Sequence, residues 1–202
     1  METADSLRDR TLGVIGYGSI GRETARIAAA LGMTVLALKR NPADHVDTGW
    51  NPPNVGDREG RIPAKWFGPD ECAALMSESD YVTVTLPATP HTRGFVAAKE
   101  IAAMRPHAYI VNIGRGSVID QNAMIAALRE KRIAGAGLDV FEREPLEADS
   151  PLWAMENVIL TPHMSGARRD YNTDACKLFA DNLVRFRAGQ PLYNVIDRAL
   201  GY

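Results

Sequence analysis

The stretch Thr11-Leu12-Gly13-Val14-Ile15-Gly16-Tyr17-Gly18-Ser19-Ile20-Gly21 decides the fold of this 202-residue chain. Residues 11–15 predict a strand, and apolar residues recurring on one side predict a helix over 19–31. The turn between them reads Gly-x-Gly-x-x-Gly, which between a strand and a helix is typical of dinucleotide binding. Gly16 permits the tight turn, Gly18 lets a pyrophosphate approach the backbone, and Gly21 lets the helix pack closely. Ser19 and Ile20 open the helix, whose N–H groups are expected to hold the pyrophosphate.

The rest of the chain alternates β-branched runs with alanine- and leucine-rich stretches. Strands are predicted over 33–38, 81–86, 108–113, 134–140 and 157–160, and helices over 70–77, 97–104, 121–131 and 171–188. This alternation indicates the α/β class: a Rossmann-type, doubly wound parallel sheet with helices on both faces. The run Tyr109-Ile110-Val111 is apolar on successive residues, which indicates a strand buried on both faces.

Residues 41–69 break this alternation. They are rich in proline, glycine and aspartate, contain Trp50 and Trp66, and predict a long connection after the second strand. Loops of this length are often functional. The alternative is a surface excursion whose tryptophans pack on a partner subunit.

The composition is that of an ordinary globular protein, with 46% hydrophobic and 24% charged residues and a formal net charge of −2. No basic stripe indicates nucleic-acid binding, and no signal peptide or membrane span is expected. Cys72 and Cys176 stand outside any CxxC or Cys/His cluster, so neither a metal site nor a disulfide framework is expected. Both are interpreted as helix packing positions in a reducing, cytoplasmic setting.

The end of the second predicted strand bears on cofactor choice. An NAD site usually places Asp or Glu there to bind the ribose 2′-OH. This chain has Leu38-Lys39-Arg40-Asn41, with no carboxylate before Asp44. Lys39 and Arg40 instead suit a 2′-phosphate, although both can also be solvated charges. The sequence therefore predicts an NAD(P) cofactor and slightly favours NADP(H).

Three later segments place polar residues just beyond strand ends, where ligands bind in open α/β sheets. They are 111–120 with Ile113-Gly114-Arg115, 135–146 with Asp139 and Glu144, and 160–166 with Thr161-Pro162-His163. Together with the glycine-rich turn, they make the chain resemble the D-isomer-specific 2-hydroxyacid dehydrogenase family. The stretch Leu86-Pro87-Ala88-Thr89-Pro90-His91-Thr92-Arg93-Gly94 is similar to the cofactor-side loop of that family. The resemblance runs from about residue 7 to the C-terminus.

The resemblance implies that His163 is the general acid/base, Glu144 its partner, and Arg115 the group that binds the substrate carboxylate and carbonyl. Histidine suits proton exchange near neutral pH, and the planar arginine suits a carboxylate. Asp139 is expected near the nicotinamide ribose and in the same proton network. The residues that the resemblance places along the cofactor are Leu86, Pro87, Ile113, Gly114, Arg115, Asp139, His163, Ser165 and Gly166.

The implied activity is hydride transfer between nicotinamide and a small 2-oxo or 2-hydroxy acid, in a homodimer. Family members carry substrate-domain sequence before the first strand, and that segment is expected to be absent here. Residues 1–170 are thus expected to form the NAD(P)-binding domain. Residues 171–202 are expected to be a helix and tail that in the family return to the substrate domain. The final helix should then leave an apolar face uncovered.

Without a second wall, Arg115, Glu144 and His163 are expected to face solvent, which weakens electrostatic interactions and turnover. The main alternative is a non-catalytic NAD(P)-binding module or truncated pseudoenzyme. A short-chain dehydrogenase is disfavoured because no Tyr-x-x-x-Lys pair occurs. An L-specific dehydrogenase is disfavoured by the context of His163.

Overall fold

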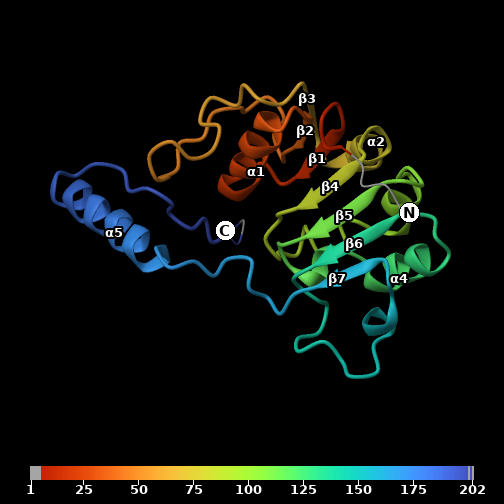
Figure 1. The fold of residues 1–202 in the computed structure, drawn as a ribbon. Helices are drawn as coiled ribbons and strands as arrows, with labels where there is room; N and C mark the ends of the chain where they lie inside the picture. Colours follow the sequence, from red (N-terminus) through yellow and green to blue (C-terminus); the bar gives the residue numbers. More distant parts are fainter. Residues whose placement is uncertain (1–5, 200, 202) are drawn as a thin grey trace.

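The computed structural model describes residues 6–199 and 201. Seven strands form one parallel sheet in the order β3-β2-β1-β4-β5-β6-β7 (Figure 1). The strands are β1 (Thr11–Ile15), β2 (Thr34–Leu38), β3 (Lys65–Phe67), β4 (Tyr81–Val84), β5 (Tyr109–Asn112), β6 (Gly135–Leu138) and β7 (Val158–Leu160). The chain builds outward from β1 on one side and then returns to its other side at β4. The predicted Rossmann-type sheet is confirmed, and its order reverses between β1 and β4.

Helices cover the two faces of the sheet unequally. They are α1 (Ser19–Ala30), α2 (Cys72–Glu78), α3 (Ala98–Ala102), α4 (Gln121–Arg129) and α5 (Tyr171–Arg187), with short 3₁₀ turns η1 (Pro69–Glu71), η2 (Gly116–Val118) and η3 (Pro151–Ala154). Leu12 and Val14 pack with Ala25 and Ala28 of α1, whereas Ile15 belongs to the larger core under α2 to α4. Because successive strand residues point to opposite faces, these are two separate cores.

The prediction that β5 is buried on both faces is wrong. Ile110 is fully buried, but Tyr109 and Val111 are 43% and 37% exposed. By the strand register, Val111 lies on the same face of the sheet as Val14 of β1 and Ile159 of β7. Helix α1 covers this face above β1 and β2. In the part of the chain that the structure describes, no helix continues that layer over β5 to β7.

The segment 41–69 is more ordered than a simple connection. It contains β3, which pairs with β2, and the prediction missed this strand because it has three residues between prolines. Arg22 of α1, 2% exposed, donates to the carbonyl oxygens of Asp57 and His45 at 2.5 and 2.7 Å. The Tyr17 hydroxyl donates to Asp57 Oδ2 at 2.9 Å. These bonds pin the segment to the glycine-rich turn.

The two tryptophans of this segment contact their own chain. The Trp66 ring stacks on His45 at 4.4 Å between centroids and meets the edge of Tyr17 at 5.0 Å. The Trp50 Nε1–H donates to Asp181 Oδ2 of α5 at 2.7 Å. Packing on a partner subunit is therefore not needed to explain either residue.

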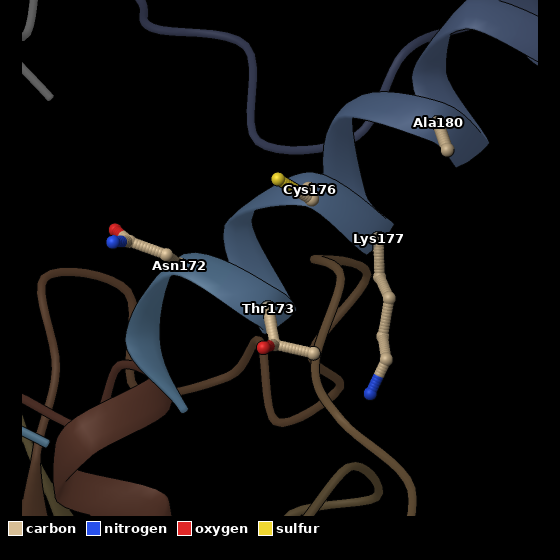
Figure 2. Close-up of a pocket in the computed structure, with 5 residues that line it drawn as sticks. All are labelled: Asn172, Thr173, Cys176, Lys177 and Ala180. Atoms are coloured by element: carbon tan, nitrogen blue, oxygen red, sulfur yellow. The ribbon is translucent and has the colours of Figure 1, made fainter. Parts of the chain in front are cut away.

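The last helix, α5, lies away from the sheet (Figure 1). None of its residues is buried, and Phe179 and Phe186 are each 71% exposed. This confirms the expectation of an uncovered apolar face. Cys176 is exposed as well, so its interpretation as a packing position is wrong, whereas Cys72 is buried. Figure 2 shows Cys176 and Lys177 projecting to different sides of α5. Within the described residues, no helix is long and apolar enough to cross a membrane.

Candidate cofactor and active site

Residues that follow β1, β2 and β4 line a cavity of about 590 Å³ at the carboxyl edge of the sheet. This volume lies in the range of small-molecule sites. Six predicted residues line it: Gly16, Gly18, Lys39, Arg40, Leu86 and Pro87. Three more lining residues, Thr89, His91 and Thr92, belong to the stretch 86–94 that resembles the family's cofactor-side loop. The sequence did not single out the remaining lining residues for a site: Tyr17, Leu38, Asn41, Asp44, Pro69, Thr85 and Phe95.

The glycine-rich turn has the geometry that a bound pyrophosphate needs. Gly16 has φ +105°, and a Cβ on Gly21 would lie 2.3 Å from the Gly16 carbonyl oxygen. A Cβ on Gly18 would meet no atom within 4 Å, so the space over this backbone is open. The Thr85 hydroxyl donates to the Gly16 carbonyl at 2.6 Å and ties the turn to β4. These residues, with exposed Ser19 and Ile20 at the start of α1, fit a dinucleotide.

Cations border the same cavity where β2 ends. Lys39 Nζ donates to the Asp44 carbonyl at 2.5 Å and lies 3.1 Å from Asp44 Oδ2. Arg40 and Asn41 line the cavity beside this pair. The two cations that the sequence suggested are therefore at the cavity, and one of them has a carboxylate partner.

Buried Asn112 shapes the loop that carries Arg115. Its side-chain amide donates to the Arg115 carbonyl at 3.1 Å, and its side-chain oxygen accepts from the Gly114 N–H at 3.1 Å. A Cβ on Gly116 would lie 1.8 Å from the carbonyl carbon of Phe141, so the loops after β5 and β6 touch through their backbones. The exposed Arg115 guanidinium donates to the Gly114 carbonyl at 2.7 Å.

Glu144 and His163 meet at this edge. Glu144 Oε2 lies 2.7 Å from His163 Nδ1, and Glu144 Oε1 accepts from the Phe141 N–H at 3.0 Å. The bond with His163 lowers the pKa of Glu144, and this effect outweighs the opposing effect of burial. The Phe141 N–H and the charges of His163 and Arg115 lower it further. Glu144 is therefore an ionised acceptor for the imidazole.

Asp139 holds the loop that presents His163. Its carboxylate accepts from the Thr161 hydroxyl at 2.6 Å and from the N–H groups of Met164 and Ser165, both at 2.9 Å. Burial alone raises the pKa of Asp139, but these hydrogen bonds bring it below its usual value. The His163 N–H donates to the Asp139 carbonyl at 2.9 Å, and His163 has φ +51°. The loop thus holds a backbone conformation that is unfavourable for histidine.

This arrangement changes the expectation for Asp139. The residue was expected in the proton network of His163. Its side-chain bonds instead go to the 161–165 loop, so it acts through the position of that loop.

A second cavity of about 680 Å³ adjoins the Glu144–His163 pair. Apolar side chains make up much of its wall: Phe141, Pro145, Leu146, Trp153, Leu160 and Pro162. Ile113, Gly114, Arg115, Ser165 and Gly166 follow strands at the same edge but are not among the described residues that line these two cavities. The predicted residues that do line a cavity thus divide between the cavity at the end of β2 and the cavity beside Glu144 and His163. No three His, Cys, Asp or Glu side chains among the described residues are placed to hold a metal ion.

The family model for the D-isomer specific 2-hydroxyacid dehydrogenase NAD binding domain matches residues 1–165. The chain belongs to this family. It is 36% identical over 192 residues to a glyoxylate reductase of Aeropyrum pernix, covering 95% of the chain and 53% of that relative. It is 38% identical over 190 residues to a glyoxylate/hydroxypyruvate reductase B of Salmonella newport, covering 93% and 54%. The chain therefore spans about half the length of these relatives.

Solved structures of 2-hydroxyacid dehydrogenases share the fold. One from Xanthobacter autotrophicus Py2, in complex with NADPH and MES, superposes with a TM-score of 0.83 at 35% identity over 100% of this chain and 76% of the other. An NADPH-dependent glyoxylate/hydroxypyruvate reductase from Sinorhizobium meliloti, in complex with NADP and sulfate, gives 0.80 at 29% identity over 100% and 60%. Because all seven strands are parallel, the loops that follow them lie along one carboxyl edge of the sheet.

The sequence interpretation overlooked two polar residues of this dehydrogenase domain. Asn112 carried a usable signal, because a polar residue that ends a buried strand before Gly-Arg-Gly needs hydrogen-bond partners. Asp44 was noted only as the first carboxylate after β2. Its contact with Lys39 depends on how the following loop turns back, which local sequence does not specify.

Proposed function

We propose that this domain binds NAD(P) along the carboxyl edge of the sheet. We further propose that it takes part in hydride transfer between nicotinamide and a small 2-oxo or 2-hydroxy acid. The observation that carries the proposal is the 2.7 Å contact between Glu144 Oε2 and His163 Nδ1, next to the loops that flank the dinucleotide cavity. The names of the relatives favour glyoxylate or hydroxypyruvate as the acid.

The bound nicotinamide supplies or accepts the hydride, and the protein handles the accompanying proton and charge. Because Glu144 engages Nδ1, His163 Nε2 is the nitrogen assigned to proton exchange with the substrate oxygen at C2. Ionised Glu144 fixes the orientation of the His163 ring. Arg115 is assigned to the substrate carboxylate, for which it exchanges its present bond to the Gly114 carbonyl.

The proposed cofactor contacts run along the whole edge. Gly16, Gly18, Ser19, Ile20 and Gly21 would hold the pyrophosphate, and Lys39 and Arg40 would lie beside the adenosine ribose. Leu86, Pro87, Ile113, Gly114, Arg115, Asp139, His163, Ser165 and Gly166 flank the nicotinamide half. NADP(H) is favoured slightly because two cations border the cavity and similar structures contain NADPH or NADP.

A specific observation also favours a binding module with little turnover of its own. The side chains of Glu144 and His163 are 35% and 46% exposed, and Arg115 is exposed too. Water at these groups weakens electrostatic stabilisation of the reaction. We therefore propose that residues 1–170 are the NAD(P)-binding domain, that 171–202 pack on a substrate domain, and that the chain alone turns over slowly.

For the chain on its own, the proposed assembly is a homodimer, in which a second copy of α5 covers the face that a substrate domain would otherwise cover, and the proposed setting is the cytoplasm. Its support is the exposed apolar face of α5, with Phe179, Leu183 and Phe186, and the two unpaired cysteines. Burial, with Glu100 nearby, raises the pKa of Cys72 to about 12, which keeps this thiol protonated and inert. Sedimentation velocity on the chain and on a Phe179→Ser/Phe186→Ser variant tests the assembly. A monomer at micromolar concentration contradicts it.

The test of function follows NADPH and NADH oxidation with glyoxylate, hydroxypyruvate and pyruvate. In His163→Ala, the rate is expected to fall by about 10²–10⁴-fold, which is the usual contribution of a general acid/base. His107→Ala is the matched control. His107 also lies 2.7 Å from a carboxylate, that of Asp80, and its side chain is 55% exposed, but it does not line the cavity.

The outcomes separate the two functions. Oxidation that survives in the His107 variant and disappears in the His163 variant supports the dehydrogenase. Cofactor binding without oxidation supports the binding module. Absence of cofactor binding contradicts both.

A further inference from the structure

Lys39 and Asp44 form an ion pair on the wall of the dinucleotide cavity, where β2 ends. The ammonium group lies 2.5 Å from the Asp44 carbonyl oxygen and 3.1 Å from the carboxylate oxygen Oδ2. The Lys39 side chain is 23% exposed and that of Asp44 is 57% exposed. The cation is thus held in place, and its partner carboxylate stands beside it in the same cavity wall.

This ion pair is expected to affect the binding of NADP(H) and of NAD(H) differently. A 2′-phosphate that approaches Lys39 also approaches the Asp44 carboxylate, which repels it and competes for the same ammonium. A ribose 2′-hydroxyl carries no charge and meets no such repulsion. It can also donate a hydrogen bond to a carboxylate. Asp44 therefore opposes the preference that Lys39 and Arg40 give the site.

We propose, on the basis of the proposed NAD(P) binding, that Asp44 is a specificity-determining residue. Its carboxylate neutralises the charge of Lys39 and so reduces the difference in affinity between NADP(H) and NAD(H). The site then discriminates weakly between NADP(H) and NAD(H). Removal of this one negative charge converts it into a site selective for the phosphorylated form.

The Asp44→Asn substitution isolates the effect of the negative charge. In Asp44→Asn, the backbone carbonyl that accepts from Lys39 at 2.5 Å remains, and the side chain keeps its size. Only the negative charge is removed. A change in affinity is then an effect of charge, since the bond that holds Lys39 is kept.

The experiment measures dissociation constants by calorimetry for 2′,5′-ADP and 5′-AMP, which probe only the adenosine end, and then for NADPH and NADH. In Asp44→Asn, 2′,5′-ADP is expected to bind about three- to tenfold more tightly, whereas 5′-AMP changes by less than about twofold. In Lys39→Met, 2′,5′-ADP binds more weakly. In the double variant the gain from Asp44→Asn is smaller, because the competition for the Lys39 ammonium is gone and only the direct repulsion between Asp44 and the phosphate is relieved.

Glu78→Gln is the matched control. Glu78 Oε1 lies 2.6 Å from Lys65 Nζ in another exposed ion pair, and neither residue lines the cavity. This variant is expected to leave both dissociation constants unchanged, which excludes an effect of overall charge.

An unchanged or weaker affinity of Asp44→Asn for 2′,5′-ADP overturns the inference, as does an equal gain in Glu78→Gln. If the unaltered chain binds neither 2′,5′-ADP nor 5′-AMP, the proposed NAD(P) site itself fails, and the inference fails with it. The two failures are therefore distinct: one shows binding without the predicted selectivity, the other no binding.

Discussion

The core between the sheet and its covering helices buries Ile110 of β5 and Leu75 of α2 completely, whereas α5 leaves Phe179 and Phe186 each 71% exposed. Both regions are rich in apolar residues, and both form regular structure. The apolar residues of the sheet are buried by helices that connect its strands in sequence. By contrast, α5 has one face directed at nothing that the described chain provides. A periodic pattern of apolar residues therefore predicts a helix or a strand. Whether its apolar face is buried depends on whether another part of the chain packs against it.

The largest expected effect is a difference in stability between substitutions in the core and substitutions in α5. Ile110→Ala is expected to lower the free energy of unfolding by about 2–5 kcal/mol, because it removes buried methyl groups and leaves a cavity. In the monomeric chain, at concentrations below those at which it dimerises, Phe179→Ala at an exposed position is expected to change it by less than about 0.5 kcal/mol. Urea denaturation followed by circular dichroism measures both. A loss above about 2 kcal/mol in the Phe179 variant shows that α5 is covered in solution.

Acid should weaken the sheet through Asp80. Burial raises the pKa of Asp80, but hydrogen bonds from His107, the Thr11 N–H and Arg105 outweigh it and bring the pKa to about 2. Because the folded pKa is below the unfolded one, Asp80 contributes about 2 kcal/mol above pH 4. That contribution is lost as the pH falls from about 4 to about 2.

Unfolding curves of Asp80→Asn and the unaltered chain check this dependence. They should differ most near pH 6 and converge toward pH 2. The exposed Glu130, paired with Arg132, provides the Glu130→Gln control, which should run parallel to the unaltered chain. A constant difference at every pH contradicts the assignment to the Asp80 charge.

Helix capping gives a smaller contrast. Asp120, the N-cap of α4, accepts from the Ala123 N–H at 3.0 Å, whereas the N-cap residue of α5, Asp170, makes no such side-chain bond. Asp120→Ala should therefore lower stability by about 1 kcal/mol. Asp170→Ala should lower it by much less. Thermal unfolding compares the pair, and equal losses would show that α5 is capped in solution.

The smallest effect concerns the contact that joins α5 to the 41–69 segment. Trp50→Phe removes the bond from Nε1 to Asp181 but keeps the ring. Amide exchange in α5 should then become about twofold faster, as expected for an exposed hydrogen bond of about 0.5 kcal/mol. Trp153→Phe is the control, since Trp153 Nε1 donates to Glu147 instead. Equal acceleration in both variants would remove any role of Trp50 in holding α5.

Much of the fold could be predicted because its signals are local. The strand, glycine-rich turn and helix over 11–30 need only periodicity and three glycines, and the structure has them almost as predicted. The three-residue strand β3 could not be predicted, since its stability comes from pairing with β2. The exposure of Val111 also could not be predicted from the sequence. An apolar strand residue does not reveal whether a helix covers it.

The site divides in the same way. His163, Glu144 and Arg115 came from motifs, and the structure brings His163 and Glu144 into contact. Asp139 was assigned to the site, but its work on the 161–165 loop became visible only with the hydrogen bonds of its carboxylate. The masking of Lys39 by Asp44 needs the path of a loop, which no local pattern encodes.

The strand order has a consequence for inheritance. The chain completes β1, β2 and β3 before it crosses to β4, so Lys39, Arg40 and Asp44 precede that crossing and Arg115, Glu144 and His163 follow it. One recombination event between these two blocks of a gene would exchange Lys39, Arg40 and Asp44 and keep the proposed reaction residues together. The order of the chain therefore keeps the proposed cofactor-preference residues and the proposed reaction residues in separate blocks of sequence.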